Sequence, residues 1–276
     1  MKKSFFVSAA LLLLLSCQSF AVSGGGYETP ADTAAIQSLG KASAKQLPRR
    51  FSLFNWNIEK AKQGDAWARD FADLIQDKDL VLVQEAISDD IFSNEMKQAP
   101  GRLWNYYVAW IRKEEKNSSG LAMGSFAQPT SATFTRTTDL EPVTKTSKLA
   151  SFQTYKVQGL KKGELLVINI HAINFVSTEK FQRHLQQVMD KVAAHVGPVI
   201  FVGDMNTWNK SRRKALMETT AQYGFTYYDF DRPNAPGMHE KLDHIFVKGL
   251  KVHKIESLTN ILTSDHYPIV GEFEVE

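Results

Sequence analysis

The sequence has very little cysteine: Cys17 is the single one among 276 residues. This excludes an intramolecular disulfide framework and a cysteine-rich zinc module, while seven histidines leave metal sites with nitrogen and oxygen ligands open. Proline and glycine are not in excess, and 43% of the residues are hydrophobic. A collagen-like fibre, a coiled coil and a wholly disordered chain are therefore excluded. The length suits one large domain or two small ones with a substantial core.

The chain also lacks a strong excess of one charge. Its formal net charge is +3, and two of the basic residues, Lys2 and Lys3, lie in the first 21 residues, which hold no acidic residue. Without them the excess of basic residues falls to one. Affinity for phosphate groups must therefore come from a local group of side chains rather than from bulk charge.

No hydrophobic run is long enough to span a bilayer. The longest, Phe5–Leu15, has 11 residues and is interrupted by Ser8, whereas a membrane-spanning helix needs about 20. A short apolar run behind two lysines is typical of a signal peptide. We therefore predict a signal peptide over residues 1–21 and export from a bacterial cell, with a periplasmic or secreted product.

Two processing routes fit this segment. Ser19-Phe20-Ala21 has the small residues that an ordinary signal peptidase recognises. Leu14-Leu15-Ser16-Cys17 resembles a bacterial lipobox, in which Cys17 would carry a lipid and tether the protein to a membrane. The two alternatives stay open.

Residues 22–48 contain few apolar side chains and several Gly, Ser, Gln and Lys residues. This composition predicts a flexible leader. The folded domain is expected over residues 49–276, as a monomer without internal repeats.

From Arg50 onward, short apolar runs alternate with helical patterns. Helices are predicted over 65–77 and 179–195, where apolar residues recur at helical spacing. Buried strands are predicted at Phe51–Trp56, Asp79–Gln84, Gly120–Phe126, Leu165–Ile170, Pro198–Val202, Leu242–Val247 and Tyr267–Val275. Some neighbouring strands have no helix between them, so a mixed sheet system in an α/β domain is expected.

Polar residues gather at the ends of six of these strands. They are Asn57 and Glu59, Glu85, His171 and Asn174, Asp204 and Asn206, Asp243, and Asp265 and His266. Each alone is explained by a solvated strand end, an Asx turn or a buried structural histidine. Together they indicate a site, because functional side chains commonly sit at strand ends on a rigid scaffold.

The order of these residues carries a resemblance to a known family. The motifs are FNWNIE (54–59), LVQE (82–85), SGLAMGSF (119–126), NIHAIN (169–174), VGDMNTW (202–208), LDHIF (242–246) and SDHYPIV (264–270). The chain resembles the endonuclease/exonuclease/phosphatase superfamily over residues 50–275, and looks most like an uncharacterised exported bacterial branch. The resemblance implies a DNase I-like four-layered α/β sandwich, with two mixed sheets packed face to face and flanked by helices.

The resemblance also implies roles for the polar residues. Mg²⁺ or Mn²⁺ would be bound by Glu85, with Asn57 beside it and Asp265 as a further ligand or support; oxygen ligands suit these hard cations. The implied catalytic residues are Asp204 on the attacking water, Asn206 on that water or the phosphate, His266 oriented by Asp243, and His171 on the phosphate or leaving oxygen. Asn174 and Lys60 are candidate substrate-binding residues. For Glu59, metal binding and a plain surface charge are both open.

The function that follows is an exported, Mg²⁺-dependent phosphodiesterase, most simply a nuclease whose partner is DNA or RNA. The basic run at 210–214, with Asn209 or Ser211 as helix cap, suits a phosphate or is only the solvated face of a helix.

Two alternative functions stay open. A sphingomyelinase-type phospholipase C or an inositol-phosphate phosphatase uses the same metal core; a lipid-active enzyme would expose an aromatic hairpin, but residues 104–107 and Trp110 suit an aromatic strand in the core better. A non-catalytic binding module would have lost catalytic residues, and all of them are present.

Overall fold

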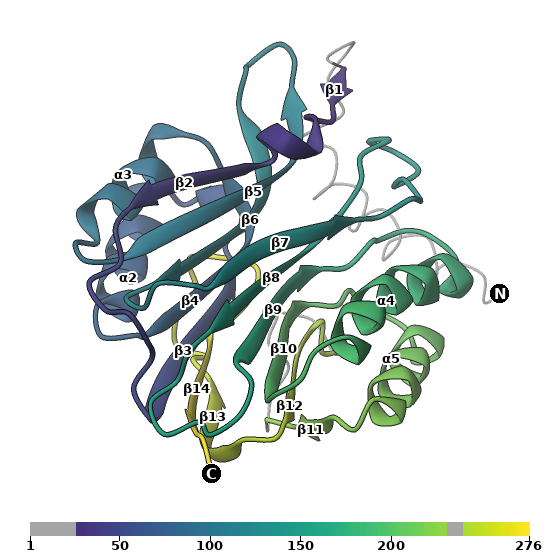
Figure 1. Cartoon of the computed structure of the whole chain (residues 1–276). Coiled ribbons are helices and arrows are strands. Elements are labelled where there is room, and N and C mark those ends of the chain that lie inside the picture. Colours follow the sequence, from purple (N-terminus) through teal and green to yellow (C-terminus); the bar gives the residue numbers. More distant parts are fainter. Residues whose placement is uncertain (1–25, 231–239) are drawn as a thin grey trace, which may run out of the picture.

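Two β-sheets pack face to face in the computed structural model, which describes residues 26–230 and 240–276 (Figure 1). The predicted signal peptide, with Cys17 and both processing sites, lies outside these ranges. Within them, every helix is too short or too polar to cross a membrane.

The larger sheet has eight strands in the order β1-β5-β6-β4-β3-β14-β13, with β2 also paired to β5. Its strands are β1 (Tyr27–Glu28), β2 (Ile36–Gly40), β3 (Arg50–Asn57), β4 (Leu80–Ile87), β5 (Leu103–Arg112), β6 (Ser118–Ser125), β13 (Lys251–Ser257) and β14 (Ile269–Glu274). β3 and β4 are parallel and the other pairs are antiparallel, so the sheet is mixed.

The smaller sheet has six strands in the order β11-β12-β10-β9-β8-β7. They are β7 (Ser131–Arg136), β8 (Leu149–Tyr155), β9 (Leu165–His171), β10 (Val199–Asp204), β11 (Thr226–Tyr228) and β12 (Asp243–Lys248). Here β9 and β10 form the parallel pair.

Helices cover the outer face of each sheet (Figure 1). α2 (Asp65–Ile75) and α3 (Asp90–Gln98) pack on the larger sheet, and α4 (Thr178–Ala193) and α5 (Lys210–Gln222) on the smaller one. Two short 3-10 helices, η1 (Asp32–Ala34) and η2 (Glu59–Ala61), complete the set. This arrangement confirms the predicted four-layered α/β sandwich.

Three apolar layers hold the sandwich together. The layer between the sheets includes Leu53, Val167 and Ile245, all fully buried. On the outside of the larger sheet, Trp67 and Phe71 of α2 stack with ring centroids 4.7 Å apart. Burying one such large apolar side chain contributes roughly 1.5–3 kcal/mol, so the fold has a sufficient core without disulfides.

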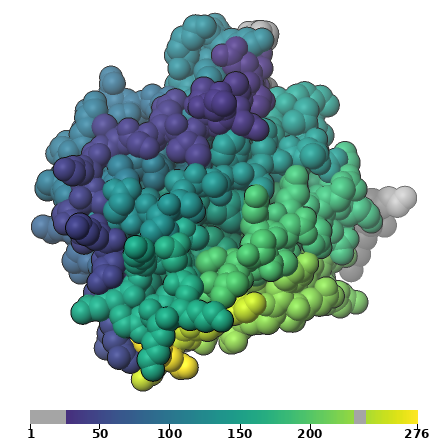
Figure 2. Space-filling view, in the orientation of Figure 1, coloured from purple at the N-terminus to yellow at the C-terminus, as the bar shows by residue number. Residues whose placement is uncertain are grey.

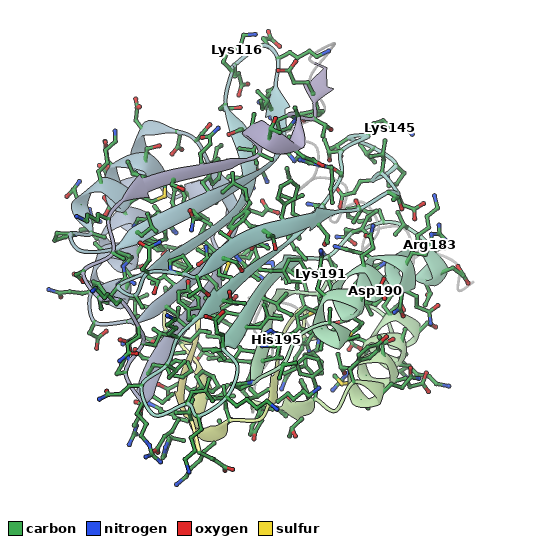
Figure 3. All side chains as sticks on the ribbon, viewed as in Figure 1. Lys116, Lys145, Arg183, Asp190, Lys191 and His195 are labelled. Atoms are coloured by element: carbon green, nitrogen blue, oxygen red, sulfur yellow. The ribbon has the colours of Figure 1, made fainter. Side chains whose placement is uncertain are left out.

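The outer face of α4 is polar, as the amphipathic pattern predicts. Arg183, Asp190 and Lys191 point away from the sheet, while His195 follows the end of the helix (Figure 3). The opposite face buries Phe181, Leu185, Val188, Met189 and Val192.

All seven predicted strands and both predicted helices are present, with ends shifted by a few residues. The aromatic strand at 104–110 is confirmed as β5, in which Trp104 and Tyr107 are fully buried. The sequence patterns did not reveal β7, β8, β13 and α3, whose residues alternate less regularly.

The prediction of a flexible leader over 22–48 is wrong for its described part. β2 pairs with β5, with Ile36 opposite Tyr107, and Ala35 and Leu47 are buried. The N-terminal residues run across the body of the molecule in Figure 2. A segment with few apolar residues is ordered here because its backbone supplies the partners that strand β5 needs.

A polar bridge joins the two sheets in their buried layer. Gln84 of β4 donates from Nε2 to Asn55 of β3 at 2.8 Å and to Asn169 of β9 at 2.5 Å. Asn169 in turn donates to the carbonyls of Val83 and Ala122. Because these groups are buried and hydrogen-bonded, they fix the position of one sheet relative to the other.

Candidate active site

Strand register brings the predicted polar residues to one edge of the sandwich. β9 and β10 are parallel and place Asp204 opposite His171, while β12 places Asp243 on the other side of Asp204. In the larger sheet, β3 ends at Asn57, opposite Gln84 of the parallel strand β4, and Glu85 is the next residue of β4. The carboxyl ends of parallel strands share an edge, so each sheet contributes half of the site.

Asp204 lies at the centre and is buried. Its Oδ2 accepts a hydrogen bond from Asn57 Nδ2 at 3.0 Å, and lies 3.4 Å from His171 Nε2 and 4.0 Å from His266 Nε2. Residues from both sheets and from the segment before β14 thus converge on one carboxylate.

His266 and Asp243 form the predicted pair. His266 Nδ1 lies 2.5 Å from Asp243 Oδ2, and both side chains are buried. Trp56 Nε1 donates to the carbonyl of His266 at 2.8 Å, and Ser264 Oγ to that of Asn57 at 2.7 Å. These bonds fasten the segment before β14 to the end of β3.

The environment moves the pKa values of these groups in opposite directions. Burial raises the pKa of Asp204 to about 7, against the attraction of His266. Burial lowers the pKa of His266, but Asp243 and Asp204 outweigh it and the pKa is raised well above the usual value. The pKa of His171 is lowered well below normal by burial and by Lys148. Divergent pKa values among neighbouring groups are typical of acid–base sites.

Glu85 and Lys60 form an ion pair on a strained backbone. Glu85 has φ 53° at a register shift in β4, and Glu59, Lys60 and Ala61 all have positive φ. Burial raises the pKa of Glu85, but the lowering by Lys60, His171 and Lys148 is larger, so the pKa lies below its normal value. Such conformations are unfavourable by roughly 1–3 kcal/mol each and cluster at functional sites.

The oxygen groups around Lys60 fit a divalent cation. The carboxylates of Glu85, Asp265 and Glu59 all raise the pKa of the Lys60 ammonium, whereas burial lowers it. In the described part of the chain, no three His, Cys, Asp or Glu side chains form a ready-made metal cluster. Mg²⁺, however, commonly uses one or two carboxylates together with water and substrate oxygens. Glu59 also pairs with Lys62.

Asn206 holds the loop after β10. Its φ is 50°, its backbone N–H donates to Asp204 Oδ1 at 2.9 Å, and its Nδ2 donates to the Ala172 carbonyl at 2.9 Å. The backbone of Asn206 is therefore bonded to Asp204, and one hydrogen of its side-chain amide joins the loops after β9 and β10. Its contact with the attacking water or the phosphate stays a prediction.

Comparison with known proteins agrees with this geometry. Residues 54–266 match the model of the Endonuclease/Exonuclease/phosphatase family. The chain belongs to this family. A UPF0294 protein of Vibrio vulnificus is 32% identical over 234 residues, covering 81% of this chain and 77% of the relative.

Solved structures of other proteins share the fold. An endonuclease/exonuclease/phosphatase from Bacteroides vulgatus has a TM-score of 0.65 at 17% identity, covering 82% of this chain and 99% of its own. The human Nocturnin catalytic domain, solved with a bound sulfate anion, has a TM-score of 0.60 at 15% identity, covering 90% and 100%. Family membership supports a phosphoric ester hydrolase of the phosphodiesterase or phosphatase type.

The basic run at 210–214 is not a uniform solvated face. Asn209 caps α5 by accepting from the Arg212 backbone N–H at 2.9 Å, as one of the two predicted caps. Arg212 itself is fully buried; it donates to the carbonyls of Asn206 at 2.8 Å and of Ile173. Its role is to join the loops after β10 and β9, because their carbonyls need buried donors.

Asn174, a predicted substrate-binding residue, uses its side chain as an anchor. Its Oδ1 accepts from Trp208 Nε1 and from the Phe175 backbone N–H, both at 2.8 Å. Its own N–H donates to Glu141 Oε1 at 3.0 Å. Asn174 thus organises the rim of the site.

Lys148 is a site residue that the sequence patterns did not reveal. Its Nζ lies 3.3 Å from His171 Nε2 and 3.6 Å from Glu141 Oε1. It lies directly before β8, a strand that was not recognised. The available signal was a lysine directly before the run LASFQTY at 149–155.

Proposed function

We propose that this family member is a divalent-metal-dependent phosphodiesterase, specifically a nuclease acting on DNA or RNA. The observation that carries the proposal is the arrangement of Asp204, whose pKa is about 7, beside the imidazolium-favouring pair of His266 and Asp243. A base poised near neutral pH next to a cationic donor is what hydrolysis of a phosphodiester requires.

Asp204 would accept a proton from the attacking water. Its Oδ2 is held by the Asn57 amide and its Oδ1 by the Asn206 backbone N–H, so its orientation is fixed before the substrate binds. Ionised, it would deprotonate the water as the oxygen attacks phosphorus. The buried site favours this transfer because a group with a pKa near the working pH is an efficient base.

His266 would donate a hydrogen bond from Nε2 to a phosphoryl oxygen, since its Nδ1 is engaged by Asp243. The charge on that oxygen grows in the transition state, so a fixed cationic donor stabilises it more than the ground state. His171, close to Lys148, is the candidate for contact with the phosphate or the leaving oxygen.

A metal ion would be held by Glu85, with Asn57 and Asp265 beside it, and would supply positive charge that neutralises the phosphoryl oxygens. Lys148 and Lys60 add cationic groups at the same edge, which supports binding of a polyanion despite the nearly neutral chain. Burial of Trp104 and Tyr107 removes the main argument for a lipid-inserting aromatic hairpin.

The test is hydrolysis by the purified protein of plasmid DNA, single-stranded DNA, RNA, sphingomyelin and inositol phosphates, with Mg²⁺ or Mn²⁺. We expect cleavage of a nucleic acid that Asp204→Asn abolishes while the folded-state circular dichroism is unchanged. Lys116→Ala, on an exposed turn (Figure 3), is the matched control. Turnover of sphingomyelin or inositol phosphates alone would contradict the nuclease assignment, and equal rates for Asp204→Asn and the parent would contradict the site. Export by residues 1–21 is a separate part of the proposal, tested by locating the protein in cell fractions.

A further inference from the structure

Two exposed aromatic residues flank the candidate active site. Phe175, four residues after His171, is 56% exposed, and Trp208, two residues after Asn206, is 42% exposed. Large aromatic side chains gain from burial, so two of them left in solvent beside a site indicate a binding surface.

Both residues are fixed by the same atom. Asn174 Oδ1 accepts from the indole N–H of Trp208 and from the backbone N–H of Phe175. Phe175 has φ 54°, a left-handed conformation that bulky residues rarely adopt. The Arg212 guanidinium lies over the Trp208 ring, 5.8 Å from its centroid, while 42% of the Trp208 surface stays exposed.

We propose that Phe175 and Trp208 form a stacking platform for an unpaired nucleobase next to the scissile phosphate, so that the preferred substrate is a single-stranded nucleic acid. This inference rests on the proposed function. A rigid aromatic surface beside cationic groups is how single strands are bound without reading their sequence, since every base has a stacking face.

The position of the platform links it to the phosphate site. Asn174 donates through its N–H to Glu141, whose carboxylate lies 3.6 Å from Lys148 Nζ, and Lys148 lies 3.3 Å from His171. The platform is therefore continuous with the residues that would hold the phosphate. A base joined to that phosphate through its sugar would extend toward the rim.

The engaged indole favours a base over a lipid surface. A tryptophan inserted at a membrane interface uses its N–H toward the wet side, whereas here that N–H is satisfied within the protein. The backbone of Phe175 is likewise held within the protein, by its hydrogen bond to Asn174 Oδ1.

The test measures binding in the Asp204→Asn background, where turnover does not interfere. A fluorescently labelled strand of twelve thymidines is compared with an abasic strand of the same length by anisotropy. We expect Phe175→Ala and Trp208→Ala each to weaken binding of the thymidine strand by roughly 5- to 100-fold, with little change for the abasic strand. Asn174→Ala should act in the same direction, because it removes the oxygen that holds both aromatic residues.

Val196→Ala is the control, because Val196 is 63% exposed but lies beyond the opposite end of α4 from Phe175. Thermal unfolding checks that each variant folds. Equal losses for both strands, or no loss, would overturn the platform. Loss of binding to phosphatidylcholine–phosphatidylglycerol vesicles without discrimination between strands would assign the aromatics to a membrane instead. If the wild-type protein cleaves no nucleic acid yet the variants discriminate between the strands, the proposed function fails and the base platform stands.

Discussion

His266 and Asp243 meet with 2.5 Å between Nδ1 and Oδ2, although one precedes the strand β14 of the larger sheet and the other begins β12 of the smaller sheet. The pair exists only when both sheets are in place. It orients Nε2 toward Asp204 and favours the imidazolium.

Because His266 and Asp243 act together, we expect their substitutions to have non-additive effects on kcat. His266→Ala should lower kcat about a hundredfold or more, because it removes a donor to the transition state, and Asp243→Asn should lower it less. The double variant should be scarcely slower than His266→Ala alone, since residues acting as a unit are not additive. Steady-state kinetics on the best substrate provide the measurement; independent, multiplicative losses would show that the two do not act together.

The pH dependence of kcat/KM should be bell-shaped. Activity should rise with pH as Asp204 ionises, because burial raises its pKa to about 7; it should fall at higher pH as His266, whose pKa is raised by Asp243, loses its proton. Asp243→Asn should move both limbs to lower pH. The reason is that the Asp243 charge raises the pKa of both partners. A pH profile in which neither limb moves would contradict this network.

Metal dependence should reveal competition between Lys60 and the ion for Glu85. EDTA should abolish activity and Mg²⁺ or Mn²⁺ should restore it, because the proposed ligands are oxygens. Lys60→Met should lower the Mg²⁺ concentration that gives half-maximal binding by several-fold, since the ammonium that pairs with Glu85 is removed. Glu85→Gln should raise it by at least tenfold.

Isothermal titration calorimetry measures the Mg²⁺ affinity of each variant directly, without substrate turnover. Lys78→Met, which removes the partner of the exposed Asp77, is the matched control. Unchanged Mg²⁺ affinity in Lys60→Met would show that the Lys60 ammonium does not compete with the ion for Glu85. Full activity in excess EDTA would show that the reaction does not depend on a metal ion.

Arg212→Lys should separate positioning from stability. One ammonium cannot reach the carbonyls of both Asn206 and Ile173, so stability should fall by about 2–3 kcal/mol. The displaced loop after β10 should lower kcat at least tenfold with little change in KM.

Arg102→Lys is the matched control for this prediction. Arg102 is also buried, donates to the Ile75 carbonyl at 2.8 Å and lies 4.0 Å over Phe126, much as Arg212 lies 4.1 Å over Phe181. We expect a similar loss in thermal unfolding and an unchanged kcat. A fall in kcat for Arg102→Lys, or none for Arg212→Lys, would contradict a specific positioning role.

The mixed sheets and the polar residues at the strand ends were predictable from local patterns, whereas the four-layered arrangement was implied by the family resemblance. Apolar runs ending in Asp204, His171 or Asn57 become adjacent once parallel strands share an edge. Local patterns give no information about which way a side chain turns. The Asn174 amide oxygen therefore became an anchor for Trp208, and Arg212 turned inward from a run that looked solvated.

Segments of mixed composition were not recognised as ordered, because their structure depends on pairing with distant strands. The residues around β2 have few apolar side chains, yet pairing with β5 orders them. Lys148 lies before a strand that alternates irregularly, so its approach to His171 depends on a sheet register that no single segment reveals.

The position of β14 has a consequence for the timing of synthesis. Residues 264–274 leave the ribosome after the rest of the site, yet β14 takes its place between β3 and β13, and His266 lies just before it. A nascent chain that lacks this segment therefore has Asp204 and Glu85 but not His266. In its larger sheet, β13 has no strand that connects it to β3. The order of translation therefore delays completion of the site: a hydrolase of this design becomes competent only when the segment that carries His266 has folded against β3.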